Sequence, residues 1–289
     1  MQVIETIPQI RNQIQALRSE NKTLAFVPTM GNLHAGHLRL VTEAKQRADE
    51  VVVSIFVNPT QFGPDEDFGS YPRTVQQDKR QLQALQTGWL FLPSATEMYA
   101  SQANTVITVK RLADAHCGAS RPGHFSGVAT IVCKLLNIVQ PDIALFGEKD
   151  FQQLTVVRAM VKDLNMPVKI HGVAIVREAD GLAMSSRNSY LSVAQRAVAP
   201  RLYQALCNAR EVIAAGENDF TALEQQQTGW LDQAGFSTDY FSVCRRSDLQ
   251  RPTSKDSELV ILAAASLGRT RLIDNIQLRR PVSVDSGCG

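Results

Sequence analysis

The stretch VPTMGNLHAGHLRL, residues 27–40, places two histidines three residues apart, with one glycine between them and another shortly before. It follows an apolar segment and opens a helical pattern, which is where parallel α/β sheets bind ligands. A helix N-terminus presents unpaired N–H groups and a partial positive charge, and both attract phosphate. Gly31 and Gly36 leave room for a ligand to approach the backbone. The pattern predicts that His34 and His37, on one face of the first turn, contact phosphate.

Two other interpretations of the histidine pair stay open on the residues alone. Both histidines are compatible with an ordinary helix start, and imidazoles one turn apart can also share a zinc ion. Neither interpretation explains why glycines follow an apolar strand directly. The glycines therefore favour phosphate contact.

A second polar cluster, ALFGEKDFQQL at residues 144–154, again joins a strand to a helix. Gly147 permits a tight turn, and Lys149 can extend a positive charge towards a phosphate. The alternative is purely structural, because Asp150 can cap the helix while Gln153 bonds back to it, a variant of the capping box. Capping and ligand contact are compatible with each other.

A third cluster, READGLAMSSRNSYL at residues 177–191, is a polar loop in which two adjacent serines precede Arg187. Such loops often close over triphosphates, where hydroxyls and a guanidinium meet developing charge. The alternative is a solvated hinge between domains. The phosphate interpretation depends on the two clusters described above.

Two further segments carry polar groups suited to a small substrate. FVNPTQF ends a strand with Asn58 and Gln61, whose amides can bind hydroxyl and carboxylate groups. RPGHFSGVATIV places Arg121 and His124 where a helix begins. There the two side chains either face an anion or belong to a turn. Turn formation is the alternative for both segments.

Six segments together resemble the pantoate–β-alanine ligase (pantothenate synthetase) family. They are PTMGNLHAGH, FVNPTQF, YPRT, RPGHFSGV, FGEKDFQQL and GLAMSSRN, in this order along nearly the whole chain. The H-x-G-H motif alone is less specific, because the wider nucleotidyltransferase superfamily and class I aminoacyl-tRNA synthetases share it. The resemblance implies an ATP-dependent condensation of (R)-pantoate with β-alanine. The products are pantothenate, AMP and pyrophosphate, the intermediate is a pantoyl adenylate, Mg²⁺ accompanies ATP, and the family forms homodimers.

The resemblance also implies roles for individual residues. His34, His37, Lys149 and Arg187 would be catalytic, with His37 as the family's proposed proton donor. Gln61 and Gln153 would bind pantoate, Gln61 would also bind β-alanine, and no protein metal ligand is expected. The residues expected to bind ATP are Met30, Gly31, Asn32, Leu33, His34, Ala35, Gly36, His37, Gly147, Glu148, Lys149, Asp150, Val176, Met184, Ser185, Ser186 and Arg187.

Three other functions use some of the same residues. A nucleotidyltransferase acting on a small phosphate ester would use the histidines but would not need Gln61 and Gln153. A non-catalytic nucleotide sensor would retain the phosphate-binding features as a switch. A zinc hydrolase would use the histidines as ligands.

Composition limits the classes of partner. The chain has 289 residues and a formal net charge of +2, which does not fit the strongly basic surface of a nucleic-acid-binding protein. Its longest apolar runs are about half of the ~20 residues that cross a bilayer, and its start does not resemble a signal peptide. The five cysteines form no C-x-x-C motif. We therefore expect a cytoplasmic enzyme that acts on small-molecule substrates and binds neither nucleic acid nor a membrane.

The elements that must position these residues alternate between helix and strand in the first half of the chain. We expect helices near 7–19, from about His37, and near 74–86, 125–138 and 150–164, with apolar strands between them. This order predicts a Rossmann-like, doubly wound parallel sheet.

A smaller α+β domain is expected to follow. We expect helices over 194–215 and 220–234, followed by two apolar strands near 238–244 and 258–266 that are closed by the segment RTRLIDNIQL at 269–278. The predicted domains are 1–175, which would bind ATP and pantoate, and 176–289, a lid or dimer-side domain. Residues 281–289, which include Cys288, are expected to form a tail beyond the fold.

Overall fold

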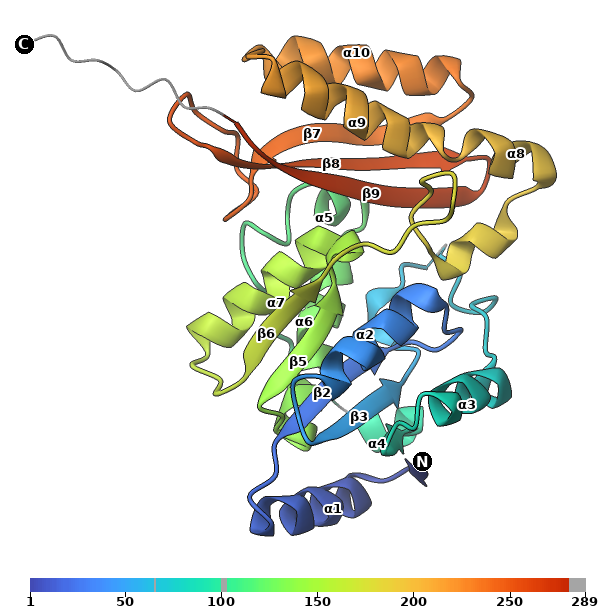
Figure 1. The fold of residues 1–289 in the computed structure, drawn as a ribbon, viewed down its shortest axis with the longest axis vertical. Coiled ribbons are helices and arrows are strands. Elements are labelled where there is room, and N and C mark those ends of the chain that lie inside the picture. The colour runs from blue at the N-terminus through green and yellow to red at the C-terminus, as the bar shows by residue number, and fades with distance from the viewer. Residues whose placement is uncertain (65, 100–102, 281–289) are drawn as a thin grey trace, which may run out of the picture. The chain divides into compact units, whose positions relative to one another are not determined.

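The computed structural model describes residues 1–64, 66–99 and 103–280 (Figure 1). The chain divides into two compact units, Met1–Val176 and Arg177–Gly289, each with a sheet of its own. The expected tail with Cys288 lies outside the described residues.

The first unit contains a six-stranded parallel sheet in the order β1-β4-β3-β2-β5-β6. From β2 the chain continues through β3 and β4 towards one edge, whereas β5 and β6 extend the sheet on the other side of β2. The loops after β2 and β5 therefore diverge, which is the switch point where such sheets bind ligands. The strands are β1 (Gln2–Ile4), β2 (Leu24–Thr29), β3 (Glu50–Ile55), β4 (Trp89–Phe91), β5 (Ile143–Gly147) and β6 (Lys169–Val173).

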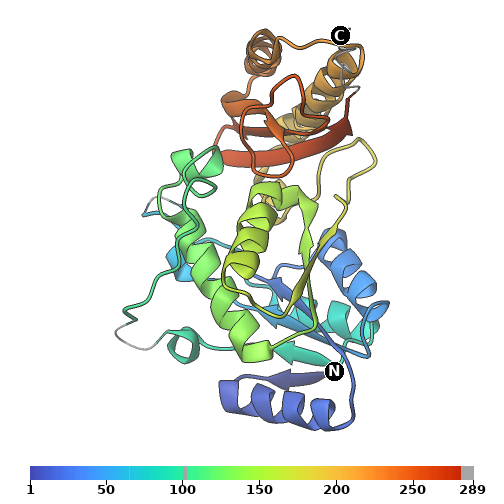
Figure 2. The ribbon, with the colours of Figure 1, turned by 90° about the vertical axis from the view of Figure 1, so that its left-hand side faces the viewer.

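Helices cover both faces of this sheet. On one face α2 packs against β2, β3 and β5, and on the other α6 packs against β2 and contacts α1 and α7. Figure 2 shows α6 and α7 on the side of the sheet away from α2. β2 and β3 are almost entirely buried as a result, which explains their near-continuous apolar sequence. The helices are α1 (Ile7–Ser19), α2 (Ala35–Lys45), α3 (Val75–Ala84), α4 (Ala95–Met98), α5 (Cys117–Ser120), α6 (His124–Val139) and α7 (Phe151–Asp163), with the 3₁₀ turns η1 (Pro59–Gln61) and η2 (Glu148–Asp150).

The second unit is an antiparallel sheet of three strands, β7 (Ser237–Arg245), β8 (Glu258–Leu267) and β9 (Thr270–Arg279). α9 (Arg201–Ala214) packs against β8 and β9, and α10 (Phe220–Gln233) packs against β7. Their apolar faces form a separate core that includes Leu202, Leu206 and Ile261. Two shorter elements precede them, η3 (Ser186–Tyr190) and α8 (Val193–Val198).

The predicted fold class is confirmed, with corrections at particular elements. The helix over 7–19 has the predicted bounds. The helix expected over 194–215 is two helices, because Pro200 lacks an N–H and stands at the start of α9. β1 was not predicted, since three residues are too few to show a periodic pattern. Among the described residues, no helix has the length and apolarity needed to cross a membrane.

Candidate active site

A buried carboxylate from α3 shapes the turn that follows β2. Asp78 Oδ2 accepts from the Asn32 N–H at 3.0 Å, and Oδ1 accepts from the Leu33 N–H at 2.9 Å. The Thr74 hydroxyl donates to Oδ1 at 3.1 Å. Gly31 has φ +81°, and a Cβ there would lie 3.1 Å from Asp78 Oδ2, so the turn requires glycine. Three residues expected to bind the nucleotide therefore share one turn, fixed by Asp78.

The two histidines cap α2 reciprocally. The helix begins at Ala35, two residues before the predicted start, and His34 is its N-cap. His34 Nδ1 accepts from the Gly36 N–H at 3.2 Å, and His37 Nδ1 accepts from the His34 N–H at 3.4 Å. The ring centroids are 4.1 Å apart. A Cβ on Gly36 would lie 2.9 Å from His34 Cε1, so glycine at this position makes room for the capping ring.

This capping fixes the protonation of both rings. A nitrogen that accepts a hydrogen bond carries no proton, so in each neutral ring the proton is on Nε2. Burial lowers the pKa of His37 to about 3, helped by repulsion from Lys149 and, at low pH, from protonated His34. Burial lowers the pKa of His34 to about 4, again with a contribution from Lys149, while Asp150 acts in the opposite direction. At pH 7 both rings are neutral, and each has one N–H donor left for a ligand.

The end of β5 lies beside this pair. Lys149, in η2, is close enough to both imidazoles to lower their pKa, and its Nζ lies 3.9 Å from Asp150 Oδ1. The proposed capping role of Asp150 is wrong, because its side chain makes no cap hydrogen bond at the start of α7. Gly147 and Glu148 complete this switch-point loop.

Gln61 lies next to Met30, a residue expected to bind the nucleotide. Its side chain is 9% exposed, and its Nε2 lies 3.1 Å from Met30 Sδ. Its Oε1 accepts from Asn58 Nδ2 at 3.1 Å. The turn interpretation of FVNPTQF is thus correct in part, because Asn58 also caps η1, and the same turn holds the Gln61 amide in one orientation.

Two adjacent glutamines on α7 differ in their contacts. Gln152 is buried, accepts from the Cys117 N–H at 3.1 Å and donates to two carbonyl groups, at 2.9 and 2.7 Å. Gln153 is half-buried, and no hydrogen bond of its side chain is found within the described residues. The Gln153 amide is therefore available to a ligand, whereas the Gln152 amide is used by the fold.

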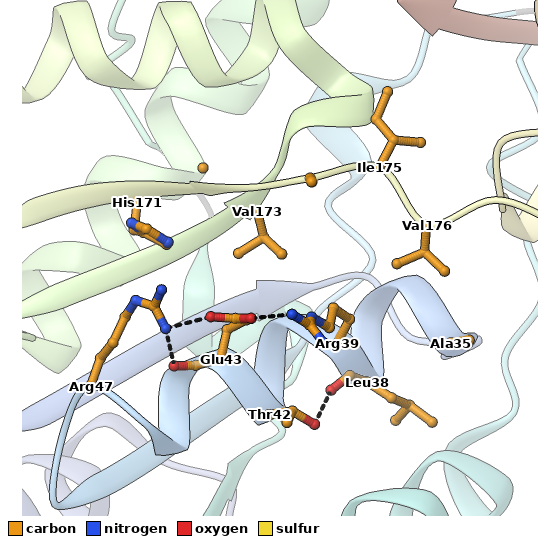
Figure 3. A pocket seen from close by; sticks show the side chains of 12 residues that line it. Ala35, Leu38, Arg39, Thr42, Glu43, Arg47, His171, Val173, Ile175 and Val176 are labelled. Carbon is orange, nitrogen blue, oxygen red and sulfur yellow. Dashed lines mark hydrogen bonds and ion pairs between the residues drawn. The ribbon is translucent and has the colours of Figure 1, made fainter.

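A cavity of about 660 Å³ lies between α2 and β6 (Figure 3). It is lined by Ala35 and Val176, two residues expected to bind ATP, and also by Val173 and Ile175 (Figure 3). Its other end is polar, because Arg39 and Arg47 both bind the carboxylate of Glu43. The apolar end is suited to a flat ring such as a nucleobase.

The remaining predicted residues, Met184–Arg187, belong to the second unit. Ser185 caps η3, and its hydroxyl accepts from the Arg187 N–H at 3.3 Å. Asn188 Nδ2 donates to the Ala183 carbonyl at 3.1 Å. These bonds give the loop a defined shape, and the contact of these residues with a nucleotide stays a prediction.

Arg121 and His124 have protein partners. Arg121 binds both carboxylate oxygens of Glu66, and His124 Nδ1 lies 2.8 Å from the Gln61 carbonyl oxygen. In this structure the Arg121 guanidinium is neutralised by Glu66. Glu66 was missed by the sequence analysis, as was Asp78, because single acids in polar segments are typical of solvated surfaces.

Known proteins resemble the chain over almost its entire length. The sequence profile of the family described as Pantoate-beta-alanine ligase matches residues 2–277. A pantothenate synthetase of Methylococcus capsulatus is 55% identical over 278 residues, 96% of this chain and 97% of that protein. The crystal structure of pantothenate synthetase from Thermus thermophilus matches with a TM-score of 0.90 and 42% identity, covering 96% of this chain and 99% of that one.

A third comparison concerns a structure with ligands. The pantoate-beta-alanine ligase from Francisella tularensis, described as complexed with beta-gamma ATP and beta-alanine, matches with a TM-score of 0.81 and 35% identity. The match covers 96% of this chain and 97% of that one. These comparisons decide between the ligase and the three other functions left open above. The chain belongs to the pantoate–β-alanine ligase family.

Proposed function

We propose that the chain condenses pantoate with β-alanine in two steps through a pantoyl adenylate. In the first, a carboxylate oxygen of pantoate bonds to the α-phosphorus of ATP, and the bond to pyrophosphate breaks. In the second, the amine of β-alanine attacks the acyl carbon, loses a proton, and AMP leaves with the bridging oxygen. A carboxylate is a poor electrophile, so activation must come first.

The observation that carries this proposal is the pair of neutral imidazoles at the switch point, beside Lys149. Transfer to phosphorus depends on positioning and on stabilising charge. The Nε2–H groups of His34 and His37 would each present a proton in a fixed position to the phosphates, and Lys149 would add a positive charge. Because burial holds the pKa of His37 to about 3, we assign it hydrogen-bond donation to the departing pyrophosphate in place of proton transfer.

The nucleotide would extend from this pair into the cavity beside α2. Ala35 and Val176 line the apolar end of that cavity, which we propose takes the adenine. Ser185, Ser186 and Arg187 would bind the triphosphate from the second unit, as the resemblance implies. The full set proposed for ATP is Met30–His37, Gly147–Asp150, Val176 and Met184–Arg187.

Mg²⁺ would arrive with ATP. The groups proposed for the phosphates are imidazole N–H and ammonium, which bind phosphate oxygens, whereas Mg²⁺ prefers oxygen ligands. The phosphates and water would therefore supply most of its coordination. The residues fit an ATP–Mg²⁺ substrate better than a resident metal ion.

The two other substrates are assigned to the glutamines. Gln61 presents an oriented amide next to Met30, and the Gln153 amide is available, so we propose that both bind the hydroxyl and carboxylate groups of pantoate. The relative from Francisella tularensis is described with β-alanine bound, which supports a β-alanine site here, also at Gln61.

The family resemblance supports three wider proposals. The first unit would bind ATP and pantoate, and the second would act as a lid or dimer-side domain. The active form would be a homodimer in the cytoplasm, where ATP is available.

Pyrophosphate release from ATP and pantoate alone tests the function. We expect about one equivalent of pyrophosphate per enzyme site, followed by AMP and pantothenate when β-alanine is added. Pyrophosphate formed only when β-alanine is present from the start would contradict the two-step order.

A further inference from the structure

We propose that Glu66, Arg121 and His124 form a positioning relay that holds Gln61 in place for pantoate. The proposal rests on the function proposed for Gln61. None of the three residues is assigned to a substrate above. Their contacts run from the loop after η1 to the Gln61 carbonyl oxygen, which lies 2.8 Å from His124 Nδ1 and accepts a longer bond, at 3.4 Å, from Arg121 Nη2.

The first link is a bidentate ion pair. Arg121 Nε and Nη2 lie 2.6 and 2.5 Å from the two carboxylate oxygens of Glu66. The two side chains are only 16% and 26% exposed, so water competes weakly for them and the two planar groups are held in one geometry. This leaves Arg121 Nη1, which lies 3.0 Å from His124 Nε2.

The second link fixes the tautomer of His124. A carbonyl oxygen can only accept, so His124 Nδ1, 2.8 Å from the Gln61 carbonyl oxygen, carries the proton. Nε2 then accepts from the guanidinium of Arg121. Burial and the charge of Arg121 lower the pKa of His124 to about 4, so the ring is neutral at pH 7 and keeps this direction of donation.

The relay ends on a backbone that is also held from its other side. Gly127 of α6 lies so close that a Cβ on it would be 2.8 Å from Gln61 Cα. Asn58 Nδ2 donates to both the Gly127 carbonyl and Gln61 Oε1. His124 therefore fixes the main chain of Gln61, and Asn58 fixes its side chain. A shift of the main chain would turn the amide away from pantoate.

This arrangement predicts a selective kinetic effect. The relay bonds to the residue proposed for pantoate, whereas its link to the residues proposed for ATP is only the charge of Asp150, which acts on His124. Its loss should therefore raise the KM for pantoate much more than the KM for ATP. His124→Ala removes the donor, whereas His124→Asn places an amide N–H close to the position of Nδ1. We expect a rise in pantoate KM of about tenfold in His124→Ala, as for one lost hydrogen bond, and recovery of most of the affinity in His124→Asn.

The ion pair is tested by Glu66→Gln, which keeps the shape of the side chain but removes its charge. We expect a rise in pantoate KM of about threefold, as for the loss of a modest charge interaction, smaller than in His124→Ala. The matched control is Arg18→Met, which breaks the ion pair with Asp142 at 2.7 Å, outside the site. It should leave both KM values unchanged.

A second readout does not depend on activity. Nitrogen NMR of wild-type protein labelled in its histidines should show His124 neutral, with its proton on Nδ1, from about pH 5 to pH 8. A charged ring or a proton on Nε2 would overturn the relay, whatever the enzyme does. An unchanged KM for pantoate in His124→Ala would also overturn the relay. The same would follow if the KM for ATP rose as much as the KM for pantoate in His124→Ala, or if His124→Asn lost as much pantoate affinity as His124→Ala. Failure of wild-type enzyme to release pyrophosphate with pantoate would instead overturn the proposed function.

Discussion

At the scale of single residues, the histidines at the start of α2 have two uses for their two ring nitrogens. Each Nδ1 accepts a backbone N–H and stabilises the helix start. Each Nε2–H is thereby fixed as the donor available to a ligand. The structural and the functional interpretation of H-x-G-H are therefore both correct, since the capping bond orients the donor.

These two uses can be separated by substitution at His37. An asparagine side chain there would retain an acceptor near the position of Nδ1 but has no group in place of Nε2–H. We expect His37→Asn to slow single-turnover pyrophosphate release by about 10²–10³-fold, as for loss of a donor to developing charge, with little change in stability. His37→Ala should show the same loss of rate and also unfold more easily, by about 1 kcal/mol.

Rapid-quench measurement of pyrophosphate, with urea unfolding of the same samples, checks both effects. Near-normal pyrophosphate release in His37→Asn would show that the Nε2–H does not act on the phosphates.

The adjacent glutamines of α7 provide a matched pair. Gln153→Ala should raise the KM for pantoate with a change in stability within about 0.5 kcal/mol. Gln152→Ala should lower the free energy of unfolding by about 2 kcal/mol, because it removes the hydrogen bonds of a buried amide to the Cys117 N–H and to two carbonyl groups. Steady-state kinetics and urea unfolding of both variants test this. The assignment of Gln153 fails if its loss costs stability and not pantoate affinity.

At the scale of elements, the close approach of α6 to η1 depends on one glycine. A Cβ on Gly127 would lie 2.3 Å from the Thr60 carbonyl oxygen, whereas a Cβ on Gly229 of α10 would meet nothing within 4 Å. We expect Gly127→Ala to destabilise the protein by about 2 kcal/mol because the helix must move. Gly229→Ala should stabilise it by up to about 1 kcal/mol through helix propensity. Thermal or urea unfolding compares the two, and equal effects would mean that α6 does not pack as described.

The sequence predicts elements well where the pattern is long and local. The amphipathic helix over 7–19 and the apolar strands β2, β3 and β8 follow from periodicity alone. The break at Pro200 was missed because apolar residues continue on both sides of it. Asp78 and the pair of Glu66 with Arg121 could not be predicted, since their partners lie 45 and 55 residues away along the chain. Contacts at such separations are decided by the folded sheet and not by local pattern.

At the scale of the whole molecule, histidines whose pKa is lowered by the fold make stability depend on pH. The pKa of His171 is lowered by burial, and the pKa values of three others are lowered strongly. The pKa is about 4 for His34, about 3 for His37 and about 4 for His124, against about 6.5 in an unfolded chain. Between these values the unfolded state binds more protons than the folded state, so the stabilisation is complete above a pH of about 6.5 and falls as the pH is lowered.

Urea unfolding at about pH 7 and about pH 5 measures this effect. We expect the free energy of unfolding to decrease by roughly 2 kcal/mol for each of these three histidines over this range. His124→Asn should show a smaller decrease than the wild type. Equal stability at the two pH values would contradict the neutral rings on which the account of the site depends.

The chain condenses pantoate with β-alanine at the expense of ATP, and the central claim is that it does so through a pantoyl adenylate. The most direct test uses pantoate labelled with ¹⁸O in its carboxylate, converted by the enzyme with ATP and β-alanine. The account predicts that one labelled oxygen appears in AMP, because the bridging oxygen leaves with the nucleotide. Label in pyrophosphate, or AMP without label, would show that the carboxylate oxygen never bonds to the α-phosphorus.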